Sequence, residues 1–508
     1  MMEWENISDI AIHYGQERPN AIAVVCGGEA LTYGELAVSV RRTAIYLRSL
    51  GIGPDDRVGV SLTNHIDHLI LSLALMRVGA VIFWLTEGMP AQKRTEIVLK
   101  YAIRTVFVEA TAAPVKAARV IRVDVAWRGR VPAAEGDARC EKTGDELSLV
   151  ILSSGSTGVP KAIVSSQRQR LARSRVHVDL LREHAPPDDP GTLIVTASLS
   201  WGFFNQCLIT QLMLGGTLVM LPKYLHPTDA IRAIASYDKV TLPVTTNMAR
   251  EFLECADRPG VLLPEVRALI VSGLPLFPSE KRALAERITP NVFEFYGTAG
   301  FGTIACLSPA DIPTNTESVG RIVVPGTVEI VDEAGHEVAP GQIGMVRCRG
   351  DSVANGFLGE KENPGPERFA DGWYYPGDMV AIDENGWVYL KGRKADIIYF
   401  KGQPVFPTEI EKKLASHPAI YEVVVVGTPS SSGYGEQAVA CVVLKNEQQR
   451  REVIAFCQKA FDKDKLLAGV YFLNQTPVTG NGKTDRLAVK HLVLQWLSQQ
   501  PGAAPLSR

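Results

Sequence analysis

Strand-like and helix-like segments alternate along the N-terminal part of the chain. Apolar residues recur at helical spacing from Thr32 to Leu50, after a Thr32–Glu35 capping pattern. Residues 57–62 are typical of a strand, 65–77 of a helix and 80–84 of another strand. This alternation predicts an α/β fold in which helices cover parallel sheets. Further strands are predicted at 193–196, 217–221, 268–271 and 292–296.

The pattern changes near Ser318. From there to Lys391, short strands alternate with turns rich in Gly, Pro and Asp, which predicts a β-rich subdomain over about 318–391. After Arg393 the pattern is a compact α+β one, with a helix that starts at a capping box, Thr408–Glu411. Strands are expected at 423–426, 438–444 and 470–473, and another helix at 453–461. We therefore expect a large N-terminal domain over 1–393 and a small C-terminal domain over 394–508.

Composition excludes several classes of protein. The chain has 508 residues and a net charge of −2, so bulk charge favours neither nucleic acid nor an anionic membrane as a partner. Eight scattered cysteines without a Cys-x-x-Cys pair indicate reduced thiols rather than a disulfide scaffold or zinc site. The longest apolar run, Leu69–Leu85, contains Arg77 and predicts a packed helix and strand, not a membrane span. With no signal-peptide pattern at the start, we expect a cytoplasmic protein; the sequence is silent on its oligomeric state.

A small-residue loop follows the strand predicted at 147–151. The segment Ser153–Gly158 contains only Ser, Thr and Gly, and it is followed by Pro160 and Lys161. Successive backbone N–H groups in such a turn can converge on an anion, and the hydroxyls and the lysine add donors and charge. The pattern therefore predicts a phosphate-binding loop, with a plain exposed turn as the alternative. It is not a Walker A loop, because Pro160 precedes the lysine and Ala162 follows it.

Other motifs follow this loop in a fixed order. They are Tyr375-Pro-Gly-Asp378, Gly392-Arg393 and the Gly-rich segment 477–486, which contains Lys483. Together they resemble the acyl-adenylate-forming enzymes, which comprise acyl- and aryl-CoA ligases, nonribosomal adenylation domains and luciferases. The resemblance extends from Leu31 to Arg486. Taken singly, the motifs have plainer interpretations: a turn-capping aspartate, a surface ion pair and a solvated lysine.

The resemblance implies that a carboxylate attacks the α-phosphate of ATP, giving acyl-AMP and pyrophosphate in the presence of Mg²⁺. The catalytic residues would be Lys483, Thr157 and Lys161, with Thr157 also contacting the metal. Asp378 would accept hydrogen bonds from the ribose hydroxyls, with Arg393 beside it. The full nucleotide-binding set implied is Ser153, Ser154, Gly155, Ser156, Thr157, Gly158, Lys161, Gly273, Tyr296, Gly297, Thr298, Asp378, Arg393 and Lys483.

The resemblance also implies a second half-reaction. In the family the small C-terminal domain is mobile, and it rotates to bring another face to the adenylate for thioester formation. The expected acceptor is coenzyme A, with Lys401 and Gly402 lining the thiol tunnel. The alternatives are a carrier-protein pantetheine and an amine. The position that is usually the hinge in the family holds Ala395 here instead of Asp or Lys. The resemblance therefore does not identify the residue about which the domain would rotate.

Two departures from the family pattern bear on the reaction. The segment Tyr296–Gly300 ends in glycine where the family has the glutamate that contacts magnesium, so a weakened adenylate-binding protein is a further alternative. The segment Ser198–Asn205 lacks the aspartate that pairs with an amino acid's ammonium group, which disfavours an α-amino acid. We expect an aryl or small acyl acid. The predicted walls of its pocket are Trp201, Phe203, Gly273 and Ala299. A dinucleotide-type Gly-x-Gly-x-x-Ala match at 300–305 is too isolated to support cofactor binding.

Overall fold

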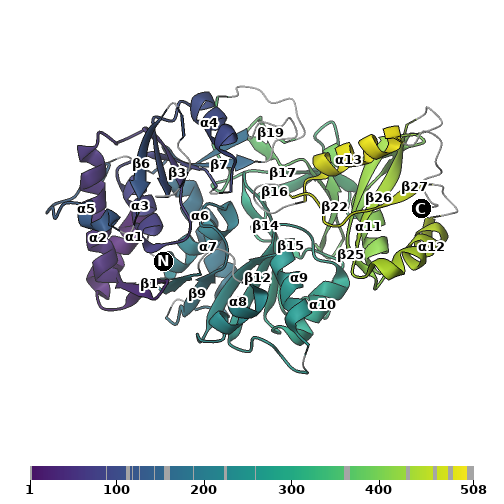
Figure 1. Ribbon diagram of the computed structural model, residues 1–508, viewed down its shortest axis with the longest axis horizontal. Helices are drawn as coiled ribbons and strands as arrows, with labels where there is room; N and C mark the ends of the chain where they lie inside the picture. The colour runs from purple at the N-terminus through teal and green to yellow at the C-terminus, as the bar shows by residue number, and fades with distance from the viewer. Residues whose placement is uncertain are drawn as a thin grey trace.

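The computed structural model describes most of the chain (Figure 1). The described residues are 3–499 without 87, 110, 111, 113, 114, 117, 125, 142, 143, 154–160, 187, 222–225, 258, 360–366, 431–434, 462–465 and 479–483.

The first sheet has the strand order β15-β14-β13-β12-β11-β9-β10-β1-β2. Strands from β13 to β1 run parallel, whereas β14, β15 and β2 pair antiparallel at the two edges. The predicted parallel arrangement is therefore confirmed, with antiparallel edges added. The strands are β1 (Ile22–Cys26), β2 (Glu29–Thr32), β9 (Thr192–Val195), β10 (Thr217–Met220), β11 (Val240–Thr245), β12 (Val266–Ser272), β13 (Val292–Thr298), β14 (Gly302–Leu307) and β15 (Arg321–Ile322).

The second sheet has the order β18-β8-β7-β4-β3-β5-β6 and again combines a parallel centre with an antiparallel edge. Helices α6 and α7 pack on each other, and α6 contacts β7 and β8 of this sheet and β14 of the first. They therefore join the two sheets (Figure 1). The strands are β3 (Arg57–Ser61), β4 (Val81–Trp84), β5 (Thr105–Glu109), β6 (Arg119–Val123), β7 (Leu147–Ser153), β8 (Lys161–Ser166) and β18 (Gly356–Phe357).

The helices of this large domain include those predicted over 32–50 and 65–77. Helix α2 has Thr32 as N-cap with the full capping box to Glu35, and every residue of α3 is buried, as expected for the packed run before β4. No helix within the described residues is long and apolar enough to cross a membrane. The helices are α1 (Ile7–Glu17), α2 (Tyr33–Ser49), α3 (Ile66–Arg77), α4 (Ala91–Lys100), α5 (Trp127–Arg130), α6 (Gln167–Leu181), α7 (Gly202–Leu214), α8 (Pro227–Ile234), α9 (Thr246–Cys255) and α10 (Pro278–Arg287).

A third, β-rich sheet follows in the chain, in the order β19-β20-β17-β21-β22 with β16 paired to β17. Its neighbouring strands pair antiparallel, and it shares a buried cluster with β13 and β14 through Tyr296 and Ile304. It therefore packs on the edge of the first sheet. The strands are β16 (Val328–Val331), β17 (Ile343–Cys348), β19 (Arg368–Ala370), β20 (Trp373–Tyr375), β21 (Asp378–Ile382) and β22 (Val388–Arg393).

The small C-terminal domain lies at one end of the molecule (Figure 1). Its sheet has the order β25-β26-β27, beside a β23–β24 hairpin, and it has a core of its own around Ile410, Val425 and Val442. The elements are a short 3₁₀ turn (Lys394–Asp396), β23 (Ile398–Phe400), β24 (Gln403–Val405), α11 (Pro407–Ala415), β25 (Ile420–Pro429), β26 (Glu436–Leu444), a second 3₁₀ turn (Glu447–Gln449), α12 (Arg450–Phe461), β27 (Leu467–Phe472) and α13 (Arg486–Gln499).

One detail of this domain corrects the sequence interpretation. The helix predicted to start at a Thr408–Glu411 capping box is present, but Phe406 is its N-cap and no side chain caps it. Pro407 occupies the first helical turn, where its fixed φ and its missing N–H group are tolerated. Thr408 therefore lies inside the helix, and the predicted capping box is wrong.

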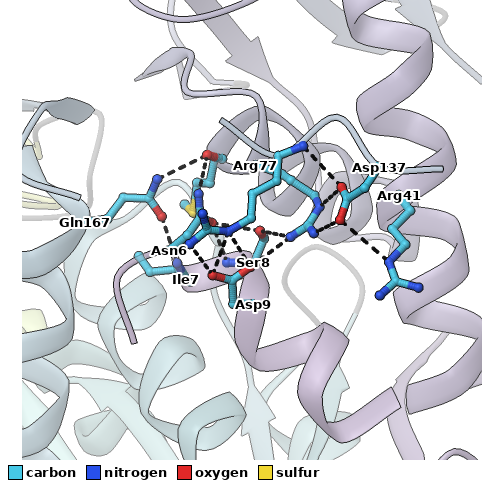
Figure 2. A network of polar contacts seen from close by, with 10 residues as sticks. Asn6, Ile7, Ser8, Asp9, Arg41, Arg77, Asp137 and Gln167 are labelled. Carbon is cyan, nitrogen blue, oxygen red and sulfur yellow. Dashed lines mark hydrogen bonds and ion pairs between the residues drawn. The ribbon is translucent and has the colours of Figure 1, made fainter. Parts of the chain in front are cut away.

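A polar network around the buried guanidinium of Arg77 ties the N-terminal helix to the rest of the large domain (Figure 2). Arg77, at the end of α3, is 2% exposed. Its Nε donates to Asp137 Oδ1 at 2.6 Å, and its Nη1 donates to Asp9 Oδ1 at 2.9 Å and to Ser8 Oγ at 3.1 Å. One guanidinium thereby connects α1, α3 and the segment before β7.

The same network reaches α6 through Gln167. The Met76 carbonyl accepts hydrogen bonds from Asn6 Nδ2 at 3.0 Å and from Gln167 Nε2 at 3.1 Å, and Gln167 Oε1 accepts from the Ile7 amide at 2.7 Å. Gln167 directly follows β8, the strand that leaves the predicted phosphate loop. The N-terminal helix is thus fixed to the element that supports that loop.

Candidate active site

The best-defined part of the site is a cluster of Asp378, Arg393 and Tyr296. Asp378 starts β21 and Arg393 ends β22, and the two are register partners in the antiparallel pair. The Arg393 Nε lies 2.8 Å from Asp378 Oδ1, and the Tyr296 hydroxyl donates to Asp378 Oδ2 at 2.8 Å. Arg393 and Tyr296, which belong to separate motifs, therefore both contact the carboxylate of Asp378.

The electrostatics of this cluster fix the protonation of its two donors. Asp378 is 5% exposed, and its negative charge raises the pKa of Arg393 above the ordinary range. Burial, followed by the charge of Asp378, raises the pKa of Tyr296 well above its usual value. The phenol therefore keeps its proton and donates it, and the guanidinium stays charged. A carboxylate has about four lone-pair sites, so Asp378 can also accept hydrogen bonds from a diol.

The end of β13, just before the turn to β14, carries the next predicted residues. A Cβ on Gly297 would collide with the Gly302 carbonyl, so the close approach of the two strands at this bulge requires glycine. Thr298 ends β13, and its Oγ1 is a buried atom that finds no hydrogen-bond partner among the described residues. A buried hydroxyl in that state suits a bound polar group.

A buried arginine that the sequence analysis did not select supports this turn. Arg173 of α6 is 2% exposed, and its guanidinium donates to the carbonyls of Ala299 at 3.0 Å, Gly300 at 3.0 Å and Ser352 at 2.9 Å. Burial lowers its pKa to about 10. Arg173 is one of several arginines close together in α6, and nothing in the sequence sets it apart from them. Its partners are backbone carbonyls far away in the chain, so no residue type reveals this role.

The predicted acid pocket is only partly defined. Gly273, just after β12, has φ +121°, and nothing lies within 4 Å of the place where its Cβ would be, so open space borders it. Trp201 and Phe203, at the start of α7, are half-buried and pack against Phe204 with ring centroids 6.0 Å and 5.2 Å apart. These two rings therefore serve the core as well as any pocket.

The phosphate loop is anchored at both ends. Ser153 ends β7 and Lys161 starts β8, and the two are register partners that close a hairpin. The Lys161 Nζ lies 5.0 Å from the centroid of the Phe357 ring. The predicted phosphate contacts of Ser154, Gly155, Ser156, Thr157 and Gly158 fall on residues outside the described part of the chain.

Lys483 also lies outside the described residues, but its loop has a defined base. Val478 and Thr484 form an isolated β-bridge, and the Asp485 amide donates to the Pro477 carbonyl at 2.8 Å. The Thr484 hydroxyl donates to Glu422 Oε1 at 3.4 Å. Thr484, the described residue that follows Lys483 in the chain, is therefore attached to β25 of the C-terminal domain.

The two residues predicted for the thiol tunnel form the tip of the β23–β24 hairpin. Lys401 has φ +51° and Gly402 φ +79°, the left-handed pair that a two-residue hairpin turn of this type needs. Both residues are exposed, and the Lys401 Nζ lies 4.9 Å from the Phe400 ring centroid. The conformation of the turn accounts for Gly402 without any ligand, so a role in thiol binding stays a prediction.

Comparison with known proteins identifies the family. The AMP-binding enzyme family matches residues 13–358, and the AMP-binding enzyme C-terminal domain matches residues 409–483. The chain therefore belongs to the AMP-binding enzymes, the class that the motifs resemble. It is 28% identical to feruloyl-CoA synthase of an Amycolatopsis species, over 92% of this chain and 94% of that protein. It is 24% identical to one of the linear gramicidin synthase proteins of Brevibacillus parabrevis, over 96% of this chain but only 6% of that much longer protein.

Solved structures share the fold. The o-succinylbenzoate CoA synthetase MenE of Bacillus subtilis, in complex with ATP and magnesium ion, superposes with a TM-score of 0.83 at 21% identity and covers 95% of this chain and 99% of its own. The amide bond synthetase McbA of Marinactinospora thermotolerans gives a TM-score of 0.82 at 22% identity, over 96% of this chain and 99% of its own. The large α/β domain and smaller C-terminal domain predicted from the sequence are confirmed.

Proposed function

We propose that this enzyme activates an aryl or small acyl carboxylic acid with ATP and Mg²⁺, releases pyrophosphate, and passes the acyl group to a thiol, coenzyme A first. The observation that carries the proposal is the Asp378–Arg393–Tyr296 cluster, held beside the β13–β14 turn in a chain of the AMP-binding family. The likeness to feruloyl-CoA synthase over nearly the whole of both chains supports coenzyme A as acceptor.

Each group in the site has a chemical task. Two anions, a carboxylate and a triphosphate, must approach each other, so the reaction needs fixed cations and aimed donors. The loop 153–161 would hold the phosphates that leave, Asp378 would accept from the ribose hydroxyls, and Lys483 would neutralise charge at the α-phosphate as the new bond forms. Arg393 holds the Asp378 carboxylate in place. A bound magnesium ion would add charge neutralisation on the phosphates.

The acid pocket favours an uncharged acyl part. The segment Ser198–Asn205 contains no carboxylate, so an α-amino acid would have no partner there for its ammonium group. The open space at Gly273 and the rings of Trp201 and Phe203 suit an apolar or aromatic acid. Ala299, whose carbonyl Arg173 holds, would form the wall next to the nucleotide.

Two alternatives remain within this proposal. The likeness in fold to an amide bond synthetase supports an amine as acceptor, and the match to a gramicidin synthase supports a carrier-protein pantetheine. From another class, the glycine at position 300 supports an adenylate-binding protein with little turnover.

An acid panel separates these functions. We expect pyrophosphate release that depends on one acid class, with hydroxycinnamates and benzoates included in the panel. Adding coenzyme A, carrier protein or an amine singly should then identify the acceptor by the product formed. The control is ATP without any acid. If none of the acids stimulates pyrophosphate release, the adenylate-binding alternative replaces the ligase.

Asp378→Asn tests the ribose assignment. Hydrogen bonds to a charged group contribute about 1.5–3 kcal/mol, so AMP affinity should fall by about 10- to 100-fold. Isothermal titration with AMP measures it, and Glu384→Gln, an exposed carboxylate change in the turn after β21, is the matched control. An AMP affinity equal to that of the control would assign Asp378 a structural role only.

A further inference from the structure

Position 300 is where the resemblance predicts a metal-contacting carboxylate and where this chain has glycine. Gly300 is buried at the β13–β14 turn. A Cβ on residue 300 would lie only 2.6 Å and 2.7 Å from Cε1 and Cε2 of the Tyr374 ring. Such distances are far inside van der Waals contact. The Tyr374 ring therefore occupies the space that a side chain at position 300 would need.

Tyr374 leads directly to another carboxylate. It lies on β20, is 1% exposed, and its hydroxyl donates to Glu367 Oε1 at 2.9 Å. Burial, followed by the charge of Glu367, raises the pKa of Tyr374 well above its usual value, so the phenol keeps the proton that it donates. Glu367 precedes β19, which pairs with β20, so its backbone is held next to the sheet. The Tyr374 ring, which occupies the space at position 300, thus holds the Glu367 carboxylate through its hydroxyl.

Glu367 is linked, directly or through Tyr374, to both ends of the predicted nucleotide site. On the ribose side, its charge contributes to the raised pKa of Arg393, after the larger effect of Asp378. On the phosphate side, a run of aromatic rings connects it to the loop. Phe369 lies 4.6 Å from Tyr374 and 5.1 Å from Phe357, ring centroid to centroid. Lys161, which ends the loop, lies over the Phe357 ring. These contacts connect the Tyr374–Glu367 pair with residues at both ends of the predicted nucleotide site.

We propose that Glu367, oriented by the Tyr374 hydroxyl, takes the place of the carboxylate missing at position 300 and binds the divalent cation that accompanies ATP. The inference rests on the proposed function, since it needs ATP in the site. Tyr374 acts as a positioning residue, because the contribution assigned to it is to orient Glu367 through its hydroxyl.

The donor set fits magnesium rather than a metal held by protein alone. Among the described residues, no group of three or more His, Cys, Asp or Glu side chains could enclose a metal. Magnesium in nucleotide enzymes is held by one or two carboxylates together with substrate phosphates and water. A single carboxylate at Glu367 meets that requirement, and the phosphates would complete it.

The test compares ATP binding with and without Mg²⁺. For the wild-type protein we expect Mg²⁺ to raise ATP affinity in titration calorimetry, and Mn²⁺ with ATP to give enhanced water-proton relaxation. In Glu367→Gln the metal-dependent part of the ATP affinity should fall by about tenfold or more. Metal-free AMP affinity should stay within about twofold. Tyr374→Phe should give a smaller loss in the same direction, and Glu384→Gln no change.

The outcomes separate this inference from the proposed function. If wild-type protein binds AMP and ATP but Glu367→Gln keeps the full effect of Mg²⁺ and the full relaxation signal, Glu367 does not bind the cation. If Glu367→Gln loses metal-free AMP affinity as well, the residue supports Arg393 or the fold, and the inference is again overturned. If the wild-type protein binds neither nucleotide, the proposed function fails and this inference fails with it.

Discussion

Replacing Lys483 with alanine should reduce acid-dependent pyrophosphate release by about 100-fold or more, the effect typical of removing one group that stabilises transition-state charge. The negative charge of the attacking carboxylate and of the α-phosphate increases as the phosphorus becomes pentavalent, and the lysine is the cation assigned to that point. AMP affinity should change much less, because ribose recognition is assigned to Asp378. The rate of pyrophosphate release is measured at saturating acid and ATP in reactions quenched at fixed times. Calorimetry measures the AMP affinity.

Two controls make this prediction specific. Lys490→Ala removes another lysine of the same domain, one in α13 that lies 3.5 Å from Glu436, and it should leave adenylation intact. Thioester formation from chemically prepared acyl-AMP should also be retained in Lys483→Ala, since the second half-reaction is assigned to another face of the small domain. A variant that adenylates at the wild-type rate would remove Lys483 from the mechanism.

The order of the motifs made part of the site predictable. Asp378 and Arg393 could be selected only through motifs that resemble those of the family, and the structure shows that the two are register partners in one antiparallel pair. Tyr296 could be selected only by its motif, because its contact with Asp378 joins residues 82 positions apart. Arg173 could not be selected from the sequence, since its partners are backbone carbonyls, which every residue type has.

The same reasoning explains the limits at the level of the fold. Periodicity predicts α2 and its capping box well, because both depend on residues close in sequence. The strand Val240–Thr245 was not predicted, although it lies inside the first sheet between β9 and β12. Pro243 lacks the N–H group that a central strand normally uses, so local preference argued against it. Tertiary packing decided the outcome there, as it did where Tyr374 fills the space at Gly300.

Replacing Arg77 with alanine should lower the free energy of unfolding by about 3 kcal/mol, the lower end of the range for breaking a buried ion pair. The side chain is 3% exposed, but Asp137 and Asp9 are 38% and 22% exposed and regain some water, which limits the loss. Asp9 also keeps its contact with Arg139 at 2.8 Å. Urea unfolding measures the change. Arg182→Ala, which breaks an exposed pair with Asp179 of α6, is the control and should cost under about 1 kcal/mol.

The pH dependence of this difference identifies its cause. Burial alone would raise the pKa of Asp137, but hydrogen bonding and charge attraction from Arg77 more than offset it, and the folded-state pKa is lowered. A lowered carboxylate pKa contributes stability above its unfolded value, about 3.9, and that contribution is lost as pH falls through the folded value. The difference in the free energy of unfolding between wild type and Arg77→Ala should therefore have its full value at pH 7 and become smaller below about pH 4. If this difference in the free energy of unfolding stays constant below about pH 4, Arg77 stabilises α3 through packing of its aliphatic part and not through its charge.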